Sequence, residues 1–449
     1  MKLEKNQEYT VTIEGCSNEG AGVARIEGFV VFVAGALRGE VCRIRILKVL
    51  KSVAYAKVTE LLTPSPHRIA PDCPYFPRCG GCTYRHMDYA EELALKRQRV
   101  QDNLARIGGS DVTVEEILGA EETMRYRNKA QFPVSSEGAV GFYRARSHEV
   151  IETAECLLVK PEADATAQAV RAYLREFRVA GYDEKTGRGL VRHVYVRSNT
   201  RGECLICLIV NGEKLPHERE LVARLRDACP KAVGIVLGVN TRRSNVILGE
   251  RYRTLWGESR LEDTLCGKSF RLSVPSFYQV NHDQAERLYA KAIEYAQLTG
   301  RETVLDLYCG AGTITLAMAG RAGRVLGAEI VPEAVEDAKE NAARSGVQNA
   351  EFFCADAGEA AAKLAREELR PDVITLDPPR KGLGEEVIAA VAGMQPARVV
   401  YVSCDSATMA RDVKRFAALG YVPRRACAVD LFPRADHVEA VVLMSRKEK

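Results

Sequence analysis

Along the second half of the chain, apolar residues form two patterns that alternate with each other. From residue 273 onward, short apolar runs are separated by longer amphipathic segments, the clearest of which places Ala285, Leu288, Tyr289, Ala292, Ile293 and Ala296 on one helical face. The apolar runs occupy residues 303–308, 324–330, 350–353, 372–377 and 398–403, and two more follow at 427–432 and 437–444. Strands that alternate with helices in this way predict a Rossmann-like, doubly wound α/β fold with a mostly parallel sheet.

The first 62 residues follow the period of β-strands instead. Short alternating runs with glycine-containing breaks predict a small β-barrel of the OB type over residues 7–62. Part of it is basic, because residues 38–57 contain a single acid, Glu40, against Arg38, Arg43, Arg45, Lys48, Lys51 and Lys57. A solvated strand face has this kind of charge, and so does a barrel that holds single-stranded nucleic acid by its phosphates. Charge alone does not decide between the two.

Residues 63–272 form a third region. A proline-rich connector leads into a cysteine cluster, residues 88–107 have a helical pattern, and a β-rich stretch then runs to about residue 272. Two of its segments mix aromatic residues with the cations Arg125, Arg127, Lys129, Arg192 and Arg197. This mixture suits RNA, and it suits the polar face of a mixed sheet equally well. We expect an N-terminal barrel at 1–62, a central β-rich domain at 63–272 and a C-terminal domain at 273–449, on which a helical segment within residues 88–120 can pack.

The composition is that of an ordinary globular protein, with 449 residues, 46% hydrophobic and 28% charged residues, and a net charge of +4. The polar start does not resemble a signal peptide, and no stretch approaches the ~18 apolar residues of a membrane span. We therefore expect a cytoplasmic monomer without a membrane partner. Its 14 cysteines are then thiols, metal ligands or catalytic groups rather than disulfides.

A glycine-rich turn joins the apolar run at 303–308 to the helix that follows. Gly310 and Gly312 let the backbone approach a ligand at the helix N-terminus, which many nucleotide-binding proteins share. The next three strands end in acids, Glu329, Asp356 and Asp377. Such acids suit the sugar and adenine of S-adenosylmethionine, and the third glycine of a dinucleotide fingerprint is replaced by Thr315. The pattern favours a methyl donor over a nicotinamide cofactor.

Cys404 follows an apolar strand, at the sheet edge where ligands of open α/β sheets bind. A free cysteine is often only a small buried apolar group. Two neighbours favour chemistry instead: the DPPR loop at 377–380 ends the preceding strand, and Glu439 shares one face of a largely apolar strand with His437. Glu439 is a candidate base of raised pKa, or else an exposed residue or a partner for an arginine.

Methyl transfer to a pyrimidine carbon would explain a thiol and a base at one site. C5 of uracil has no lone pair, but addition of a thiolate at C6 makes C5 nucleophilic, and C5 can then take a methyl group. A base must next remove the C5 proton so that the thiol is eliminated. Since an ordinary thiol has a pKa of ~8.5, we expect the site to lower this value.

The motifs as a set resemble those of the RNA uracil-5-methyltransferase family. SVPSFYQVNHDQAERLY, LDLYCGAGT, DPPRKG, VSCDSATMARD and DHVEAVVL follow in the family's order, RYRNKAQF resembles a segment of its central domain, and residues 1–62 resemble its RNA-binding TRAM module. The resemblance implies that Cys404 is the nucleophile and Glu439 the base. It places Gln279, Tyr308, Glu329 and Asp377 at the methyl donor or the target uracil, and Thr313 and Asp356 where the family lines the donor pocket with various side chains.

The same resemblance implies S-adenosylmethionine as cofactor and RNA as partner. The barrel favours 23S ribosomal RNA, because family members that act on transfer RNA usually lack it. Alternatives are methylation of transfer RNA, methylation of cytosine C5, which usually employs a proline–cysteine loop in place of DPPR, and a non-catalytic RNA-binding assembly factor. The combination of Cys404, Glu439 and the glycine-rich loop counts against the last.

A separate cysteine cluster occupies residues 73–82. Cys73, Cys79 and Cys82 have the spacing C-x5-C-x2-C, which is compatible with zinc, and Cys156 is the best-placed fourth thiol. Zinc sites more often use two C-x2-C pairs. The three-plus-one arrangement resembles that of the iron–sulfur members of the family, which implies a [4Fe-4S] cluster with a structural or RNA-positioning role.

Overall fold

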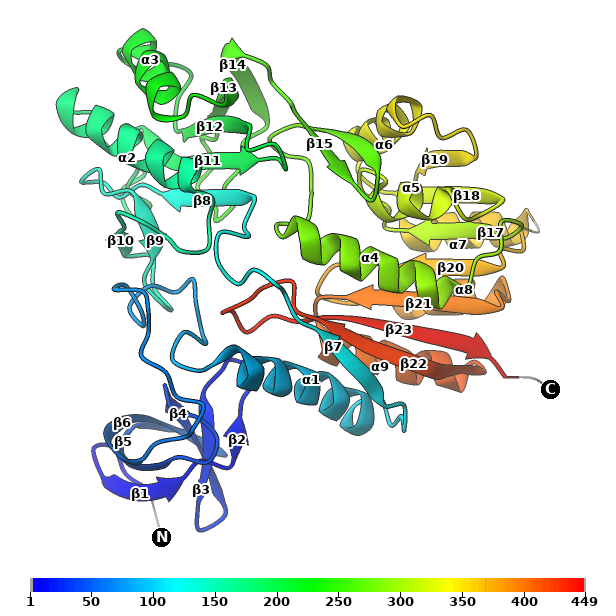
Figure 1. Cartoon of the computed structure of the whole chain (residues 1–449), viewed down its shortest axis with the longest axis horizontal. Helices are drawn as coiled ribbons and strands as arrows, with labels where there is room; N and C mark the ends of the chain where they lie inside the picture. The colour runs from blue at the N-terminus through cyan, green and yellow to red at the C-terminus, as the bar shows by residue number, and fades with distance from the viewer. Residues whose placement is uncertain (1–2, 368, 448–449) are drawn as a thin grey trace.

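The computed structural model describes residues 3–367 and 369–447, which form three parts (Figure 1). A small sheet from the N-terminal region lies at the lower left, a central sheet lies above it, and a large C-terminal sheet lies to the right. Residues 1–2 and 448–449 of the predicted domain ranges lie outside the described residues. The domain boundaries themselves stay predictions.

The N-terminal part is a strongly curved sheet with the strand order β1-β5-β6-β4-β3-β2. Its strands are β1 (Glu8–Thr12), β2 (Gly15–Cys16), β3 (Gly22–Ile26), β4 (Phe29–Ala34), β5 (Val41–Val49) and β6 (Val53–Thr63). In β5, buried Cys42, Ile44 and Ile46 alternate with exposed Arg43 and Arg45. This period of two, repeated along the sheet, gives the part a hydrophobic core of its own.

The central part contains a five-stranded sheet in the order β14-β13-β12-β11-β8. Its strands are β8 (Lys129–Pro133), β11 (Val191–Ser198), β12 (Cys204–Val210), β13 (Ala232–Val239) and β14 (Arg251–Gly257). Two hairpins flank it, β9 (Gly141–Tyr143) with β10 (Val150–Glu152), and β15 (Leu261–Leu265) with β16 (Lys268–Leu272).

Two helices, α2 (Pro161–Glu176) and α3 (Glu218–Ala228), cover one face of the central sheet. The sequence analysis predicted a β-rich stretch here and did not identify these two helices within it. The buried face of α2 includes the small residues Ala163 and Ala167, which give a weak hydrophobic signal in the sequence. Pro161 in the first turn is the start signal that marks this helix.

The C-terminal sheet is doubly wound, as the alternating pattern predicted, and has the order β19-β18-β17-β20-β21-β23-β22-β7. Its strands are β7 (Val114–Leu118), β17 (Thr303–Leu307), β18 (Arg324–Glu329), β19 (Ala350–Cys354), β20 (Val373–Leu376), β21 (Arg398–Ser403), β22 (Tyr421–Val429) and β23 (Glu439–Arg446). The five strands from β19 to β21 in this order are parallel, and β23 runs antiparallel between β21 and β22.

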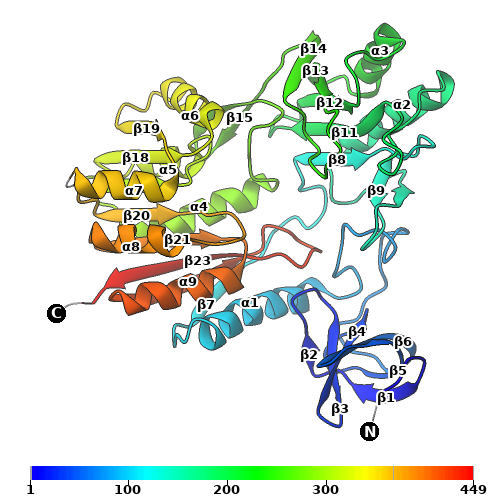
Figure 2. The same cartoon turned by 180° about the vertical axis from the view of Figure 1, so that it is seen from behind.

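Helices cover both faces of this sheet. On one face lie α4 (His282–Ala296), α5 (Thr313–Ala319) and α6 (Pro332–Arg344), in front in Figure 1. The other face, in front in Figure 2, carries α1 (Tyr89–Arg106), α7 (Ala357–Arg366), α8 (Glu385–Gly393) and α9 (Ser406–Ala418). Helix α1 and strand β7 precede the central sheet in sequence, yet β7 pairs with β22 at the edge of the C-terminal sheet.

This topology places a site at the centre of the molecule. The carboxyl ends of β17 and β21 point toward the central sheet (Figure 1), and the order of the parallel strands reverses between β17 and β20. Ligands of open α/β sheets bind at such a reversal. Among the described residues, no helix is both long and apolar enough to cross a membrane.

Candidate active site

Cys404 lies between the end of β21 and the start of α9. The Asp405 side chain caps that helix and accepts hydrogen bonds from the backbone N–H groups of Ala407 and Thr408, each at 3.0 Å. The half-buried thiol therefore has a fixed position at the sheet edge. Burial, and secondarily the Glu439 carboxylate, raise the pKa of the Cys404 thiol to about 11, although Arg380 lowers it.

The expectation that the site lowers the thiol pKa is therefore wrong for the protein without ligands. The thiol pKa is raised because burial removes water from a group that must become an anion, and because the Glu439 carboxylate lies nearby. Arg380 is the cation that opposes both effects.

Glu439 is the first residue of β23 and is only 3% exposed. Ser403 pairs with Ala440 in the antiparallel register, so the next position places Cys404 opposite Glu439. Burial raises the pKa of Glu439 to about 8, with a further contribution from Asp377 and an opposing one from Arg380. The carboxyl group can therefore both hold and release a proton near neutral pH.

The DPPR loop after β20 completes this group. Asp377 is a second carboxyl group of unusual pKa, which burial and then Asp306 raise to about 7. Arg380 has its guanidinium beside the Cys404 thiol, and its Nη2 donates to Nε2 of His437 at 3.2 Å. Neither Arg380 nor His437 received a role from the sequence, although both belong to motifs that were recognised.

The glycine-rich turn after β17 forms the other half of the site. Tyr308, Gly310 and Gly312 have positive φ angles of 71°, 54° and 83°, a conformation that glycine adopts without strain. Glu329 at the end of β18 accepts hydrogen bonds from the backbone N–H groups of Gly310 at 3.1 Å and Val331 at 3.0 Å. Its carboxylate is thus held across the turn.

Buried Tyr289 of α4 connects two further predicted residues. Its hydroxyl lies 3.1 Å from Oγ1 of Thr313, and it also hydrogen-bonds the side chain of Gln279. Burial, and then the Asp377 carboxylate, raise the pKa of Tyr289. Tyr289 was predicted only as part of an apolar helix face, and the fold alone brings it here.

Asp356 is the most exposed of the predicted acids. Its Oδ1 accepts from the backbone N–H of Gly358 at 2.9 Å, and its charge contributes to the raised pKa of Tyr308. The predicted donor-side residues therefore lie along one edge of the sheet, from Asp377 to Asp356.

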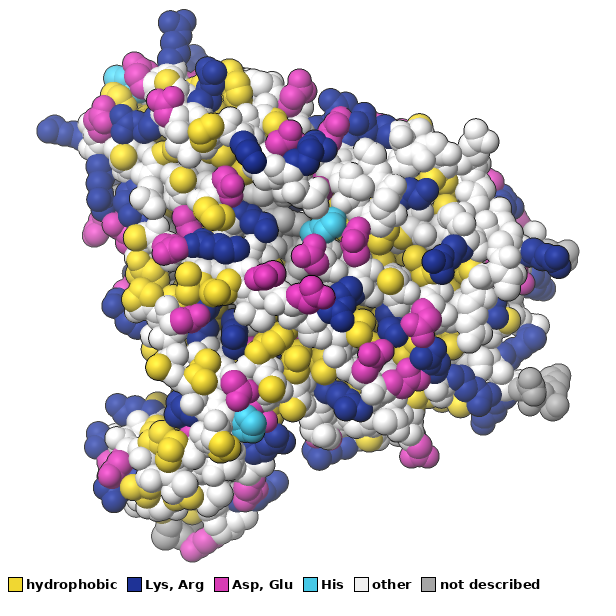
Figure 3. Space-filling model, viewed as in Figure 1, with side chains coloured by type: hydrophobic (Ala, Val, Ile, Leu, Met, Phe, Trp, Pro, Cys, Tyr) yellow, Lys and Arg dark blue, Asp and Glu magenta, His cyan; other side chains and the backbone are white. Residues whose placement is uncertain are grey.

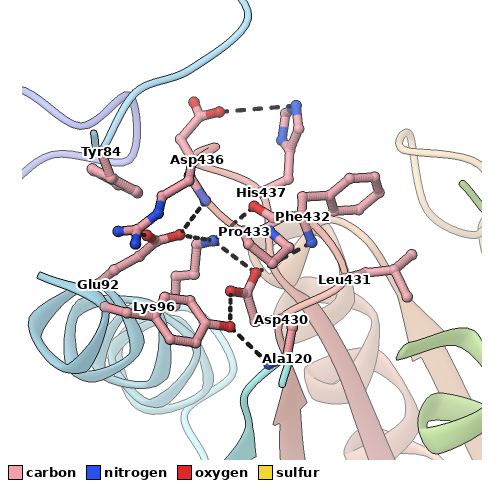
Figure 4. Close-up of polar contacts among 12 residues, drawn as sticks. Tyr84, Glu92, Lys96, Ala120, Asp430, Leu431, Phe432, Pro433, Asp436 and His437 are labelled. Atoms are coloured by element: carbon pink, nitrogen blue, oxygen red, sulfur yellow. Dashed lines mark hydrogen bonds and ion pairs between the residues drawn. The ribbon is translucent and has the colours of Figure 1, made fainter. Parts of the chain in front are cut away.

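The segment that leads into Glu439, residues 430–438, is anchored by a buried ionic cluster (Figure 4). Lys96 of α1 is fully buried and donates to Glu92 at 2.7 Å, to Asp430 at 2.8 Å and to the carbonyl oxygen of Phe432 at 3.0 Å. All three ammonium protons thus have acceptors. Asp430 also accepts from Tyr89, at 2.7 Å.

Other parts of the chain bind the carbonyl groups of the same segment. Side chains from the start of α4, from Tyr126 and from α1 donate to it, as do backbone N–H groups at residues 83 and 84. These bonds reach the carbonyl oxygens of Asp430, Leu431, Pro433, Arg434 and Asp436. The position of the candidate base therefore depends on residues outside the C-terminal domain.

The four predicted metal-ligating cysteines, Cys73, Cys79, Cys82 and Cys156, line one cavity of about 60 Å³ beside Arg127. Burial raises the pKa values of Cys79, Cys82 and Cys156. Among the described residues, no group of three or more His, Cys, Asp or Glu side chains is placed to hold a metal ion. The structure thus brings the four thiols around one cavity without arranging them as metal ligands.

The cations of the central region divide into two kinds. Arg125 pairs with Asp164 at 2.8 Å and with Glu155, and Arg192 donates to backbone carbonyl oxygens at 2.7 and 2.9 Å. For these two, the interpretation as part of a mixed sheet is favoured. In the barrel, Arg38, Arg43 and Arg45 are likewise paired with acids, at 3.0, 2.6 and 2.7 Å.

One face of the molecule carries a large cleft of mixed charge. The cleft, of about 1030 Å³, lies between the central sheet and the start of α4, and its lining includes Glu121, Glu122, Glu162, Asp283 and Glu286. Figure 3 shows acidic side chains gathered near the middle of this face. The lining also includes the cations Arg125, Lys160 and Arg287.

The doubly wound sheet, with a glycine-rich turn and acids at successive strand ends, defines a methyltransferase of the S-adenosylmethionine-dependent class. Known proteins agree with this class. The family model described as tRNA (uracil-5-)-methyltransferase matches residues 88–447, and a TRAM domain model matches residues 2–59. The chain belongs to the RNA uracil-5-methyltransferase family.

Similar proteins extend over the whole chain. An uncharacterized RNA methyltransferase of Halalkalibacterium halodurans is 43% identical over 99% of this chain and 98% of its own length. Another from Clostridium acetobutylicum is 40% identical over 100% and 99%. The crystal structure of a Pyrococcus abyssi tRNA (uracil-54, C5)-methyltransferase with S-adenosyl-L-homocysteine has a TM-score of 0.78 and 26% identity, and covers 97% of this chain and 100% of that chain. The protein is thus an S-adenosylmethionine-dependent RNA methyltransferase.

Proposed function

We propose that this enzyme methylates C5 of a uracil in structured RNA, with Cys404 as nucleophile and Glu439 as base. The observation that carries the proposal is the pairing of β21 with β23, which sets the thiol opposite a buried carboxyl group whose pKa is about 8. A uracil stacked within the RNA has to be flipped out to reach them.

Each residue has one task in this mechanism. The Cys404 thiolate adds to C6, and the electron pair of the C5–C6 bond moves onto C5 and the O4 carbonyl. S-Adenosylmethionine supplies the methyl group that C5 accepts. Glu439 then takes the C5 proton, and the electrons of that C–H bond restore the double bond as the Cys404 sulfur leaves. Arg380 favours the thiolate form of Cys404, both before the addition to C6 and after the elimination.

Two variants test the chemistry. With Cys404→Ala, methylation should be lost while RNA affinity is retained. With Glu439→Gln, a covalent protein–RNA adduct should accumulate, because elimination needs the base. Denaturing gels with labelled RNA measure the adduct, and RNA bearing 5-fluorouracil should trap the wild-type enzyme. Unchanged turnover without Cys404 would remove it as nucleophile, and the absence of any adduct with Glu439→Gln would indicate another proton acceptor.

The pH dependence follows from the same two groups. Both Cys404 and Glu439 act in their deprotonated forms, and their pKa values lie at about 11 and about 8. Single-turnover methylation should therefore speed up as the pH rises from 7 to 9. A rate that fell over this range would contradict these roles.

Ribosomal RNA is the first candidate substrate, supported by the TRAM module. Transfer RNA is the second, because the similar Pyrococcus abyssi enzyme is a tRNA (uracil-54, C5)-methyltransferase and covers 97% of this chain. Mass mapping of 5-methyluridine in ribosomal and transfer RNA from cells without this protein separates them. The RNA that loses the modification is the substrate.

We propose that Cys73, Cys79, Cys82 and Cys156 hold a [4Fe-4S] cluster. The support is that all four thiols, three of them at the C-x5-C-x2-C spacing, line one cavity of about 60 Å³. Its part is to hold the cysteine segment beside the central sheet, because the methyl transfer moves no electrons between redox centres. Anaerobically purified protein should be brown and contain iron, and Cys156→Ser should contain less. A colourless protein with one zinc ion would overturn the assignment.

A further inference from the structure

Three cations come together on one face of the central sheet. Arg197 of β11 lies directly opposite Lys129 of β8 in the antiparallel register, so their side chains share a face. Arg127 lies two residues before Lys129 and contributes, with Arg197, to the electrostatics of its ammonium group. The fold thus concentrates positive charge at this end of the sheet.

Among the described residues, neither Lys129 nor Arg197 has an acid to neutralise it, whereas Arg127 borders the cysteine cavity and donates to the Tyr126 hydroxyl. Within the described part of the chain, no carboxylate forms an ion pair with Arg127, Lys129 or Arg197. Arg197 is only 2% exposed, its Nη2 donates to the carbonyl oxygen of Ser276 at 2.6 Å, and its Nη1 is buried without a partner. Charges out of water are normally paired, so Lys129 and Arg197 can take an anion from outside the chain.

The group adjoins the candidate active site. Asn128, next to Lys129, donates to the carbonyl oxygens of Gln279 at 2.9 Å and Val280 at 2.8 Å. On the other side, Arg127 contributes to the lowered pKa of His437, whose Nε2 accepts from Arg380 beside Cys404. The three cations therefore lie between the segment that carries Gln279 and the residues around the thiol.

We propose that Lys129, with Arg127 and Arg197, binds a phosphodiester group of the substrate RNA next to the target uridine. The inference rests on the proposed function, because it assigns the RNA group that this site takes. Lys129 is only half-buried, whereas Arg197 is almost fully enclosed. S-Adenosylmethionine is a poor occupant, since its sulfonium and ammonium groups would be repelled by three cations.

A phosphate held here would set the position of the flipped nucleotide. Phosphate contacts fix register and orientation without reading sequence, and a reacting base has to lie within a few tenths of an ångström of its productive place. Lys129 is thus a positioning residue, whose loss should weaken RNA binding and leave cofactor binding intact.

The first test compares Lys129→Gln, Lys129→Arg and the control Lys214→Gln in the full-length enzyme. Lys214 is exposed and follows the end of β12, whereas Arg197 lies near the start of that strand. Lys129→Gln should weaken binding of the substrate RNA about 10-fold and reduce the slope of log affinity against log salt by about 0.7–1. Lys129→Arg should keep most of the affinity, and Lys214→Gln should behave as wild type. Equal affinity and slope for Lys129→Gln would overturn the proposal.

The second test locates the phosphate. Each linkage around the target uridine is replaced in turn by an uncharged methylphosphonate, and binding is measured with wild type and Lys129→Gln. One linkage should weaken wild-type binding and have no further effect on the variant. This scan needs only the wild-type protein for its first readout, so it stands even where the variant fails to fold. The proposal is wrong if no methylphosphonate weakens RNA binding by the wild type. It is also wrong if every methylphosphonate weakens binding by Lys129→Gln as much as it weakens binding by the wild type.

Two controls separate the possible failures. Equilibrium dialysis with S-adenosylmethionine should give the same affinity for wild type and Lys129→Gln, and loss of cofactor affinity with normal RNA affinity would assign the cations to the cofactor carboxylate instead. Adduct formation by wild type with 5-fluorouracil RNA tests the proposed function independently. If the adduct forms but Lys129→Gln binds RNA as the wild type does, only the phosphate site is refuted. If no adduct forms, the proposed function itself is refuted.

Discussion

Lys96 and Lys129 lie in regions of opposite charge balance, although both are withdrawn from bulk water. Lys96 in α1 has three acceptors, two of them carboxylates, and no exposed surface. Lys129 in β8 faces two arginines, and burial together with these lowers its pKa to about 8. A buried charge that the chain itself neutralises supports the fold, whereas one that the chain leaves uncompensated is available to a ligand.

The largest expected effect is that of breaking the compensated cluster. Lys96→Met leaves Glu92 and Asp430 buried without their shared cation, and removal of one partner from a buried ionic cluster costs about 3–5 kcal/mol. Urea unfolding followed by circular dichroism should show this loss of stability. The triple variant Glu92→Gln, Lys96→Met, Asp430→Asn should recover most of the lost stability. A Lys96→Met protein as stable as wild type would contradict the proposed difference between the two lysines.

A smaller effect of opposite sign is expected at Lys129. Lys129→Met removes repulsion from Arg127 and Arg197, so the free energy of unfolding should stay unchanged or increase by up to about 1 kcal/mol. Thermal melting at low salt measures the change. A destabilisation of more than about 1 kcal/mol would indicate that Lys129 has a structural partner after all.

The smallest effect is a change of RNA affinity with pH. Since burial, and then Arg197 and Arg127, lower the pKa of Lys129 to about 8, its ammonium group loses its proton above this pH. RNA affinity should therefore decrease several-fold between pH 7.5 and 9.5 in wild type. Lys129→Arg should bind equally well across the range, and a wild-type curve as flat as that of the arginine variant would contradict the assignment.

Much of the C-terminal sheet could be predicted because strands and helices there have distinct periods and clear ends. The predicted run at 398–403 coincides with β21. Cys404 was singled out by its place after this run and Glu439 by its face on a largely apolar strand, and their roles stay predictions. The central region was harder, since the small buried residues of α2 weaken its period. Tertiary proximity was not predictable either: Tyr289 has the sequence signature of a core residue, yet it contacts two site residues.

The division of the central cations shows the same limit. Arg125 and Arg127 are two residues apart in one motif, and no local pattern distinguishes them. Arg125 reaches the acids Asp164 and Glu155, whereas Arg127 lies beside Lys129 and the cysteine cavity. Only the folded chain reveals which cation has been neutralised.

The anchoring of residues 430–438 limits how this protein can be divided or recombined. A fragment that starts at residue 273 would retain every predicted catalytic side chain, but it would lack Lys96, Tyr126 and the backbone donors at residues 83 and 84. The barrel meets α1 through the pair Arg38–Glu91 and through a small apolar cluster that joins Leu37 to Leu95. Exchange of the barrel between relatives should therefore be tolerated far better than exchange of the region that follows it.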